Sequence, residues 1–391
     1  MTDSKAEWTQ QDTAYMAEAI QLARKGLYTT EPNPRVGCVL VKNGQIIGRG
    51  WHQKAGEGHA EVNAIKDAGL QARGSTAYVT LEPCSHFGKT PPCASALIQA
   101  GVARVVSAME DPNPEVSGSG FDLLQKAGIQ IESGLLESQA QVLNLGFVKR
   151  MNTKRPFVRI KMAMSVDGRT AMASGESKWI TGSAAREDVQ RLRARSSAVI
   201  SGIGTVLYDD AALTVRANEL GLENAEEISK RQPLRVILDT DAQLPESAKL
   251  FTLPSPILLV VSSEAQVPDS ILQYSNVSVF RLPAATKESV RSNSLDVVLA
   301  ELARRGCNEV LVEAGASLAG SFIRENCWDE LVLYVAPKLM GSSARPLANL
   351  PMEYMSEAKP LQLKDIRVVG DDIRLTYHQG CSNLTDASST E

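Results

Sequence analysis

The stretch HAEVNAIKDAGLQARGSTAYVTLEPCSHFGKTPPCASALI, residues 59–98, decides the fold expected for the first part of this 391-residue chain. Its apolar pattern predicts a helix at 60–68, a short strand at 76–81 and, after a loop, a helix at 94–100. Before it, Asn43-Gly44 separates two apolar runs and predicts a hairpin, because this dipeptide adopts the positive backbone angles of a tight turn. Strands and helices alternate in this way to about residue 150, which favours a layered α/β domain with a mostly parallel sheet.

A second set of alternating elements follows the first. We expect a strand at 157–164, helices at 184–195, 295–305 and 317–325, and further strands at 198–203, 234–238, 257–261, 309–313, 330–336, 362–369 and 372–378. The polar segment 151–156, which ends at a proline, marks the join between the two sets. The chain is therefore expected to form two domains, residues 1–150 and 151–380, with a disordered polar tail at 381–391.

The composition excludes several classes of protein. Hydrophobic residues make up 43% of the chain and charged residues 22%, which is ordinary for a globular protein and unlike a disordered one. A formal net charge of -4 provides no positive field for nucleic acid or an anionic membrane. No apolar run approaches the roughly 20 residues that cross a bilayer, and the start lacks a secretion signal, so we expect a cytoplasmic protein. The six unevenly spaced cysteines do not indicate a disulfide framework.

His59, Cys84 and Cys93 are candidate metal ligands. One imidazole and two thiolates are a set that zinc favours, and three protein ligands leave the fourth tetrahedral position open for water. Glu61 follows His59 by two residues, so it can lie beside the metal without binding it. Because side chains two positions apart diverge on a helix, we expect His59 to lie at or before the helix cap.

A zinc ion that activates water, next to a glutamate that does not bind it, is the equipment for hydrolytic deamination of an electron-poor ring. Zinc deaminases combine His-x-Glu with Pro-Cys-x-x-Cys, and this chain matches the first half of that pattern. Eight residues instead of two separate its cysteines, which leaves His86 as an alternative to Cys93. A buried cysteine pair beside a helix-capping histidine is the non-catalytic interpretation.

Three segments resemble the deaminase half of the bifunctional riboflavin-biosynthesis deaminase/reductase family: EPNPRVGCVLV (31–41), GWHQKAGEGHAEVNAI (50–65) and YVTLEPCSHFGKTPPCASALI (78–98). Members of that family have a long loop between the cysteines, so the resemblance favours Cys93 as the third ligand. It implies a cytidine-deaminase-like three-layer α/β/α domain followed by a dihydrofolate-reductase-like α/β domain, and it extends over about residues 13–378.

The resemblance also implies the first substrate, 2,5-diamino-6-(5-phosphoribosylamino)pyrimidin-4(3H)-one, which is deaminated to 5-amino-6-(5-phosphoribosylamino)uracil. Asn33, flanked by prolines, suits the amide edge of the ring, and His52 suits the ribose or the phosphate. His86 and Lys89 are candidates for hydrogen bonds to the ring or the phosphate. A role in shaping the loops is the alternative for all four residues.

The second half contains no strict dinucleotide fingerprint, because Leu207 stands where a third glycine would follow Gly202-Ile203-Gly204. It does contain VLVEAGASLAGSFI (310–323), a strand, a glycine and a helix, in which backbone amides can approach a phosphate. Tight packing of the strand against the helix is the alternative interpretation.

The second half is similar to the reductase half of the same family, most clearly at IKMAMSVDGRTAMASGESKWITG (160–182) and DELVLYVAPKLMG (329–341). This likeness implies that the chain uses NADPH and yields 5-amino-6-(5-phosphoribitylamino)uracil. It implies an NADPH site made of Ala163, Trp179, Thr205, Asp209, Thr240, Gly315, Ala316, Ser317, Leu318, Ala319, Gly320 and Ser321. It implies a substrate site made of Ser177, Arg193, Leu213, Arg216 and Glu313.

Charged residues of the second half have open alternatives. Arg193 and Arg216 suit bidentate contacts with the sugar phosphate. Lys161 and Asp209 are candidates for proton handling in the reductase step, and an ion pair or a solvated turn is the alternative for each. Trp179 is a candidate wall for the nicotinamide, although single aromatic residues usually belong to a core.

The expected partners are a small phosphorylated substrate and a further copy of the chain, with neither nucleic acid nor a membrane. A nucleoside or tRNA deaminase with an accessory domain is a second hypothesis, but it requires a basic, aromatic-rich surface, and only 5% of the residues are aromatic. A non-catalytic metabolite-binding protein is a third hypothesis, which the intact set of ligands and Glu61 argues against.

Overall fold

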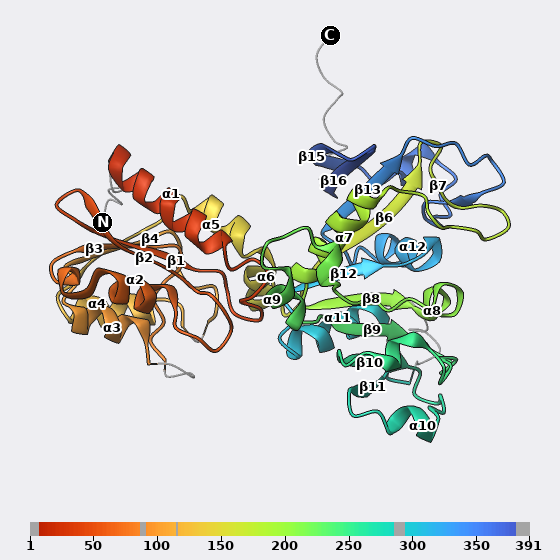
Figure 1. The fold of residues 1–391 in the computed structure, drawn as a ribbon, viewed down its shortest axis with the longest axis horizontal. Coiled ribbons are helices and arrows are strands. Elements are labelled where there is room, and N and C mark those ends of the chain that lie inside the picture. Colours follow the sequence, from red (N-terminus) through yellow and green to blue (C-terminus); the bar gives the residue numbers. More distant parts are fainter. Residues whose placement is uncertain (1–7, 87–90, 115, 285–293, 381–391) are drawn as a thin grey trace, which may run out of the picture. The chain divides into compact units, whose positions relative to one another are not determined.

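The computed structural model describes residues 8–86, 91–114, 116–284 and 294–380. The chain divides into two compact units, Met1–Arg155 and Pro156–Glu391 (Figure 1). The tail expected to be disordered, residues 381–391, lies outside the described residues. Within the described ranges, no helix combines the length and the apolar character that a membrane crossing requires.

A five-stranded sheet in the order β2-β1-β3-β4-β5 forms the centre of the first unit. Its strands are β1 (Gly37–Lys42), β2 (Gln45–Trp51), β3 (Thr76–Val79), β4 (Arg104–Ser107) and β5 (Gln130–Ser133). Strands β3, β4 and β5 run parallel, whereas β1 pairs antiparallel with both β2 and β3. The predicted hairpin between β1 and β2 is confirmed, and its turn residues Asn43 and Gly44 have φ angles of 52° and 74°.

In the part of this unit that the structure describes, helices cover the two faces of the sheet. They are α1 (Gln10–Arg24), α2 (Ala60–Ala68), α3 (Cys93–Ala100), α4 (Ser119–Lys126), α5 (Glu137–Leu143) and α6 (Leu145–Thr153). Buried residues of α1, α5 and α6 pack on one face, and buried residues of α2, α3 and α4 pack on the other (Figure 1). The predicted three-layer α/β/α arrangement is thereby confirmed, and it brings the starts of α2 and α3 close to the end of β3.

The second unit is built on a nine-stranded sheet in the order β11-β10-β9-β8-β12-β6-β13-β16-β15. Its strands are β6 (Phe157–Ser165), β8 (Ala198–Gly202), β9 (Leu234–Leu238), β10 (Ile257–Val261), β11 (Val277–Arg281), β12 (Glu309–Glu313), β13 (Glu330–Ala336), β15 (Leu361–Val369) and β16 (Asp372–Gln379). The strands from β11 to β13 are parallel, and β16 and β15 add an antiparallel edge. The short strands β7 (Arg169–Ala171) and β14 (Arg345–Pro346) pair separately.

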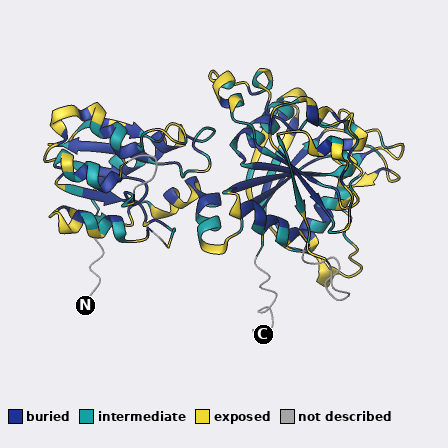
Figure 2. Ribbon diagram, turned by 90° about the horizontal axis from the view of Figure 1, so that it is seen from below, coloured by how far each residue is buried: buried dark blue, intermediate teal, exposed yellow. Residues whose placement is uncertain are grey.

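Helices also cover both faces of the large sheet. They are α7 (Ser183–Arg195), α8 (Ile203–Asp209), α9 (Ala225–Lys230), α10 (Asp269–Leu272), α11 (Ser294–Arg304) and α12 (Ala316–Arg324). One core contains residues of α11 and α12, and the other contains residues of α7 and α8. The central strands between them, such as β10 and β12, are buried (Figure 2). The expected mixed α/β fold is confirmed, and the parallel strands β8 and β12 both end where a helix begins.

Candidate active sites

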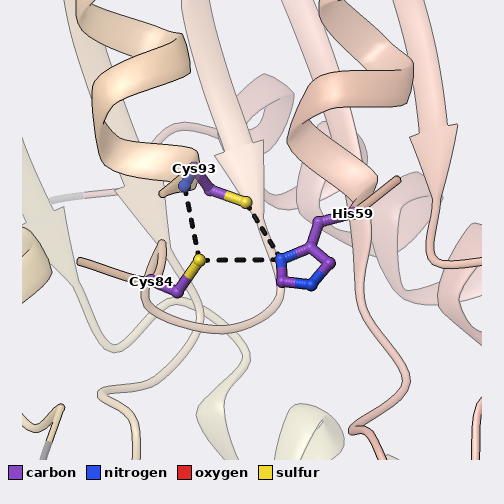
Figure 3. Close-up of side chains that lie close together, drawn as sticks. All are labelled: His59, Cys84 and Cys93. Carbon is purple, nitrogen blue, oxygen red and sulfur yellow. Dashed lines mark hydrogen bonds between the residues drawn. The ribbon is translucent and has the colours of Figure 1, made fainter. Parts of the chain in front are cut away.

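The starts of two helices and the loop after β3 bring His59, Cys84 and Cys93 together (Figure 3). His59 Nδ1 lies 3.1 Å from Cys93 Sγ and 3.6 Å from Cys84 Sγ. All three ligand atoms lie within 4.8 Å of one another, so this donor set fits one tetrahedral zinc ion with a free fourth position. The group contains Cys93 and not His86, which is exposed.

The backbone explains how His59 and Glu61 share one site. His59 is the N-cap of α2, with extended backbone angles of φ -73° and ψ 168°, as expected from the two-residue spacing. Glu61 lies in the first helical turn and is only 3% exposed. Its side chain therefore points into the protein beside the ligands instead of diverging from them.

The electrostatics of the cluster suit a bound cation. Hydrogen bonds with Cys93 and His59 lower the pKa of the Cys84 thiol to about 4, against the effect of burial. The hydrogen bond to Cys84 raises the pKa of His59, and burial raises the pKa of Glu61 to about 7. A metal ion binds a thiolate and a neutral imidazole, so it would take the place of the proton that His59 holds against the Cys84 thiolate.

Two further predicted residues lie next to this cluster. His52 is 3% exposed, and its ring is 5.3 Å from the ring of His59 in an edge-on arrangement. Its Nε2 is 3.1 Å from Asn33 Nδ2, and its Nδ1 is 3.2 Å from the Gly58 carbonyl oxygen. Burial lowers the pKa of His52, which favours a neutral ring. Lys89 lies outside the described residues.

In the second unit, an ion-pair cluster lies where β12 ends. Glu313 accepts hydrogen bonds from Arg193 Nε at 2.5 Å and from Arg193 Nη2 at 3.0 Å, and Lys161 Nζ is 3.6 Å from it. The charges of Arg193 and Lys161 outweigh burial and lower the pKa of Glu313 to about 2. Arg193 Nη1 also donates to the Thr214 carbonyl oxygen. The N–H groups of the Arg193 guanidinium are therefore bonded to a carboxylate and a carbonyl oxygen. A bidentate contact with phosphate would require two of these N–H groups to be available.

Among the residues that the structure describes, none fills the side-chain position of Gly315 at the start of α12. Gly315 is its N-cap, with no side-chain cap, and a Cβ added there would meet nothing within 4 Å. Free backbone N–H groups at a helix start attract phosphate, so Gly315, Ala316 and Ser317 fit the anionic part of a dinucleotide. By contrast, Ala319 is fully buried, and a Cβ at Gly320 would meet the Asn349 carbonyl oxygen at 2.4 Å.

The remaining predicted residues of the second unit differ in exposure. Trp179 is 64% exposed, with the Arg186 guanidinium 4.6 Å from its ring centre, so it does not belong to the core. Leu213 is 2% exposed and packs inside. Arg216 is exposed and forms two hydrogen bonds with Glu219. The remaining residues predicted for the NADPH and substrate sites are half-buried or exposed: Ala163, Ser177, Thr205, Asp209, Thr240, Leu318 and Ser321.

Two residues that hold the Trp179 segment have no signal in the sequence. Lys338 Nζ donates to the Trp179 carbonyl oxygen at 2.8 Å, and Asp372 Oδ2 accepts from the Gly182 N–H at 2.8 Å. Both come from strands or loops more than 150 positions away in the chain. Lys178 of the same segment pairs on the surface with Asp209, the last residue of α8, at 3.3 Å.

Comparisons with known proteins match both units. A family model described as RibD C-terminal domain matches residues 156–375, and one described as cytidine and deoxycytidylate deaminase zinc-binding region matches residues 9–109. The chain is 50% identical to riboflavin biosynthesis protein RibD of Haemophilus influenzae, over 95% of this chain and 98% of that protein.

Solved structures agree with these matches. Acinetobacter baumannii RibD is 47% identical, with a TM-score of 0.86, over 95% of this chain and 99% of that one. The Thermotoga maritima diaminohydroxyphosphoribosylaminopyrimidine deaminase/5-amino-6-(5-phosphoribosylamino)uracil reductase is 33% identical, with a TM-score of 0.79 and the same coverage. Both likenesses extend across the two units.

Proposed function

The chain belongs to the RibD family of riboflavin biosynthesis, and from this premise we propose how its residues carry out the two reactions of that family. The first reaction is zinc-dependent hydrolytic deamination of 2,5-diamino-6-(5-phosphoribosylamino)pyrimidin-4(3H)-one. The second is NADPH-dependent reduction of the ribose side chain, which yields 5-amino-6-(5-phosphoribitylamino)uracil. The observation that carries the assignment of the first site is the convergence of His59, Cys84 and Cys93 within 4.8 Å beside the buried Glu61.

In the first site, His59, Cys84 and Cys93 hold zinc. When bound, the ion acts as a Lewis acid that makes water a nucleophile at neutral pH. Glu61 handles the proton: as the water oxygen bonds to the ring carbon, its carboxylate takes the proton and returns it to the departing amino group. The carbon–nitrogen bond then breaks, and ammonia leaves. Burial of Glu61 keeps bulk water away from this transfer.

Asn33 and His52 recognise the substrate in the first site. They are hydrogen-bonded to each other, and His52 is fixed on its other side by the Gly58 carbonyl. A neutral, fixed imidazole beside an amide suits a polar ring edge or a ribose hydroxyl. We assign His86 and Lys89 to contacts with the ring or the phosphate of this substrate; His86 is exposed, next to the Cys84 segment.

In the second site, Gly315, Ala316 and Ser317 at the start of α12 would hold the phosphates of NADPH, and the exposed Trp179 would contribute to the nicotinamide site. When bound, NADPH supplies the hydride that reaches the ribose carbon bearing the amine. Thr205, Asp209, Thr240 and Ala163 complete the cofactor site.

The sugar phosphate of the second substrate meets Arg216 and Ser177, and Leu213 contributes its backbone. The Arg216–Glu219 pair is exposed and therefore weak, so Arg216 can exchange Glu219 for a phosphate. Arg193 acts through Glu313, which it orients, and Lys161 beside Glu313 is the proton donor.

Glu61→Gln tests the separation of the two sites. Zinc-loaded variant protein is expected to release no ammonia from the diaminopyrimidine phosphate. On substrate that has already been deaminated, it is expected to oxidise NADPH at the wild-type rate. Loss of both activities would refute separate sites.

We further propose that the chain forms a homo-oligomer through the edge strand β15. This strand exposes aliphatic residues along its length, including Leu363 (47%), Ile366 (59%) and Val368 (76%). An unpaired edge with apolar side chains is suited to pairing with a second copy. Light scattering of wild type and Val368→Lys tests this proposal, because only the wild type is expected to exceed the monomer mass.

The location follows from the two substrates. NADPH and a sugar phosphate carry charges that prevent unaided membrane crossing, so we propose that the enzyme works in the cytoplasm. Fractionation of cells that produce the protein tests this location, and recovery with membranes or the periplasm would contradict it.

A further inference from the structure

Glu82, two residues before Cys84, has a buried carboxylate that is surrounded by backbone N–H groups. The residue is 3% exposed. Oε1 accepts hydrogen bonds from the backbone N–H groups of Gly120 at 2.8 Å and Phe121 at 3.4 Å. Oε2 accepts from the backbone N–H groups of Asp111 at 3.1 Å and Gly118 at 3.0 Å. One side chain thus binds both ends of the segment 111–121.

These hydrogen bonds cap helix α4 from a distant part of the chain. The N-cap of α4 is Gly118, which has no side chain to accept from the first N–H groups of the helix. Glu82 supplies the missing acceptor, and its negative charge lies at the positive end of the helix dipole. The start of α4 is therefore attached to residue 82 rather than capped locally.

The same helix start lies directly on the segment that carries Cys84. A Cβ added at Gly120 would meet the Pro83 carbonyl oxygen at 2.0 Å, so the two backbones are in close contact. The hydroxyl groups of Ser85 and Ser119 are 2.6 Å apart. Contacts on both sides of Cys84 thus join its segment to α4.

The opposite side of Cys84 is held by α3. The Ala94 N–H donates to the Cys84 carbonyl oxygen at 3.1 Å, and the Cys93 N–H donates to Cys84 Sγ at 3.3 Å. Cys84 therefore lies between the starts of two helices. A shift of α4 would move the Cys84 segment relative to Cys93 and His59.

We propose that Glu82 is a positioning residue for deamination: by docking the start of α4 on the segment 83–85, it fixes Cys84 Sγ where the metal requires it. The proposal rests on the deaminase site proposed above. It assigns Glu82 no contact with the substrate, and its effect reaches the reaction only through Cys84.

Glu82→Gln is the main test, because glutamine keeps the size of the side chain. Its NH2 group faces two backbone N–H donors, and the negative charge at the helix start is lost. Groups that orient metal ligands typically change activity about 10- to 100-fold, so we expect kcat for ammonia release to fall by that factor. Zinc content and NADPH oxidation on deaminated substrate are expected to stay at wild-type values.

Glu132→Gln is the matched control. Glu132 lies on β5 of the same unit, where its two carboxylate oxygens accept from Arg104 at 3.0 and 2.9 Å. This control also removes a hydrogen-bonded carboxylate, but one without contact to the Cys84 segment. Both variants are assayed well below the lower of their melting temperatures, and Glu132→Gln is expected to keep its kcat for deamination.

Cobalt substitution supplies a readout that does not depend on turnover. Thiolate-to-cobalt absorption bands report the geometry of Cys84 and Cys93, and we expect Glu82→Gln to shift them while Glu132→Gln leaves them unchanged. Ser119→Ala removes one contact of the same docking surface, and it is expected to shift the bands in the same direction by a smaller amount.

Three results would overturn the proposal: cobalt bands unchanged in both Glu82→Gln and Ser119→Ala, equal kcat losses in Glu82→Gln and Glu132→Gln, or losses that follow only the unfolded fraction. A wrong assignment of the deaminase activity would give a different result from a wrong role of Glu82. Zinc-loaded wild-type protein would then release no ammonia, while the cobalt spectra of the variants would still decide the role of Glu82.

Discussion

Replacement of Glu330 by glutamine tests the charge cluster at the amino-terminal ends of the inner strands β12, β6 and β13, whereas the proposed NADPH site lies at the carboxyl end of β12. Arg159, 2% exposed on β6, donates to Glu330 on β13 and to Glu309 Oε2 on β12 at 3.2 Å. His378 lies 3.5 Å from the other oxygen of Glu330. Glu330 and Glu309 begin their strands, whereas Glu313 ends β12, so this variant perturbs stability without touching the site.

The size of the effect follows from the pKa of Glu330. The charge of Arg159 and the hydrogen bond to His378 outweigh burial and lower this pKa from 4.5 to about 2. Because each pH unit between the unfolded and the folded pKa of Glu330 is equivalent to about 1.36 kcal/mol, the difference between 4.5 and about 2 corresponds to about 3 kcal/mol of stability at pH 7. Breaking one partner of a buried ion pair has a similar cost of about 3–5 kcal/mol. We therefore expect Glu330→Gln to lower the free energy of unfolding of this unit by about 3 kcal/mol.

The sign of the pH dependence is fixed by the direction of the shift. Because the folded-state pKa lies below the unfolded value, the contribution is complete above about pH 4.5 and decreases as the pH falls toward 2. The difference between wild type and variant is expected to shrink to about half by about pH 3. Hydrogen exchange of β6 and β13 amides in increasing urea measures this unit alone.

Glu227→Gln is the control for this experiment, because its pair with Lys230 is exposed and such pairs contribute about 0–1 kcal/mol. A loss of less than about 1 kcal/mol in Glu330→Gln at pH 7, or an equal loss at pH 7 and pH 3, would show that the ionised Glu330 does not stabilise this unit through Arg159.

Three other variants or treatments have equally definite outcomes. Arg235→Leu removes the buried guanidinium that donates to the carbonyl oxygens of Leu250 and Ser255, and of these two Ser255 keeps the Asn276 side chain as a donor. We expect a loss of about 3 kcal/mol by urea unfolding, and a loss below about 1 kcal/mol would contradict this. Gly50→Ala places a Cβ 2.1 Å from the Ala60 carbonyl oxygen and pushes β2 away from α2. Ammonia release is expected to disappear while NADPH oxidation persists. Full ammonia release would show that β2 and α2 can move apart without disturbing the site. Removal of zinc by a chelator is expected to abolish ammonia release reversibly and to leave NADPH oxidation unchanged, as followed by metal analysis and both assays.

The metal cluster could be predicted because its residues lie in short, recognisable sequence motifs. His59 and Glu61 are two positions apart, and each ligand stands at the start of a helix or just after a strand. Zinc accepts few residue types, so the identities themselves carry the information. The extended backbone of His59 follows from the same spacing, and the structure agrees with it.

Strands β5 and β11, each at an edge of its sheet, were not predicted from the sequence, whereas the edge strands β2 and β15 were. Strand β5, with the sequence QIES, is an edge strand of the five-stranded sheet. Strand β11, with the sequence VSVFR, is an edge strand of the nine-stranded sheet. Both are half-buried or exposed, so they need no continuous apolar run and leave little periodic signal. Central strands such as β10, ILLVV, are buried along their whole length and were found at the predicted positions.

The roles of charged residues depend on partners that sequence proximity cannot supply. Arg193 and Glu313 are 120 positions apart, and only the neighbouring ends of α7 and β12 bring them together. An arginine among polar neighbours suggests a phosphate ligand, whereas the same arginine against a buried carboxylate is already neutralised. Glu82 shows the converse, because its four partners are backbone N–H groups that any sequence possesses. A metal ligand is therefore recognisable from its own identity, while a positioning residue becomes recognisable only when the chain has placed its partners.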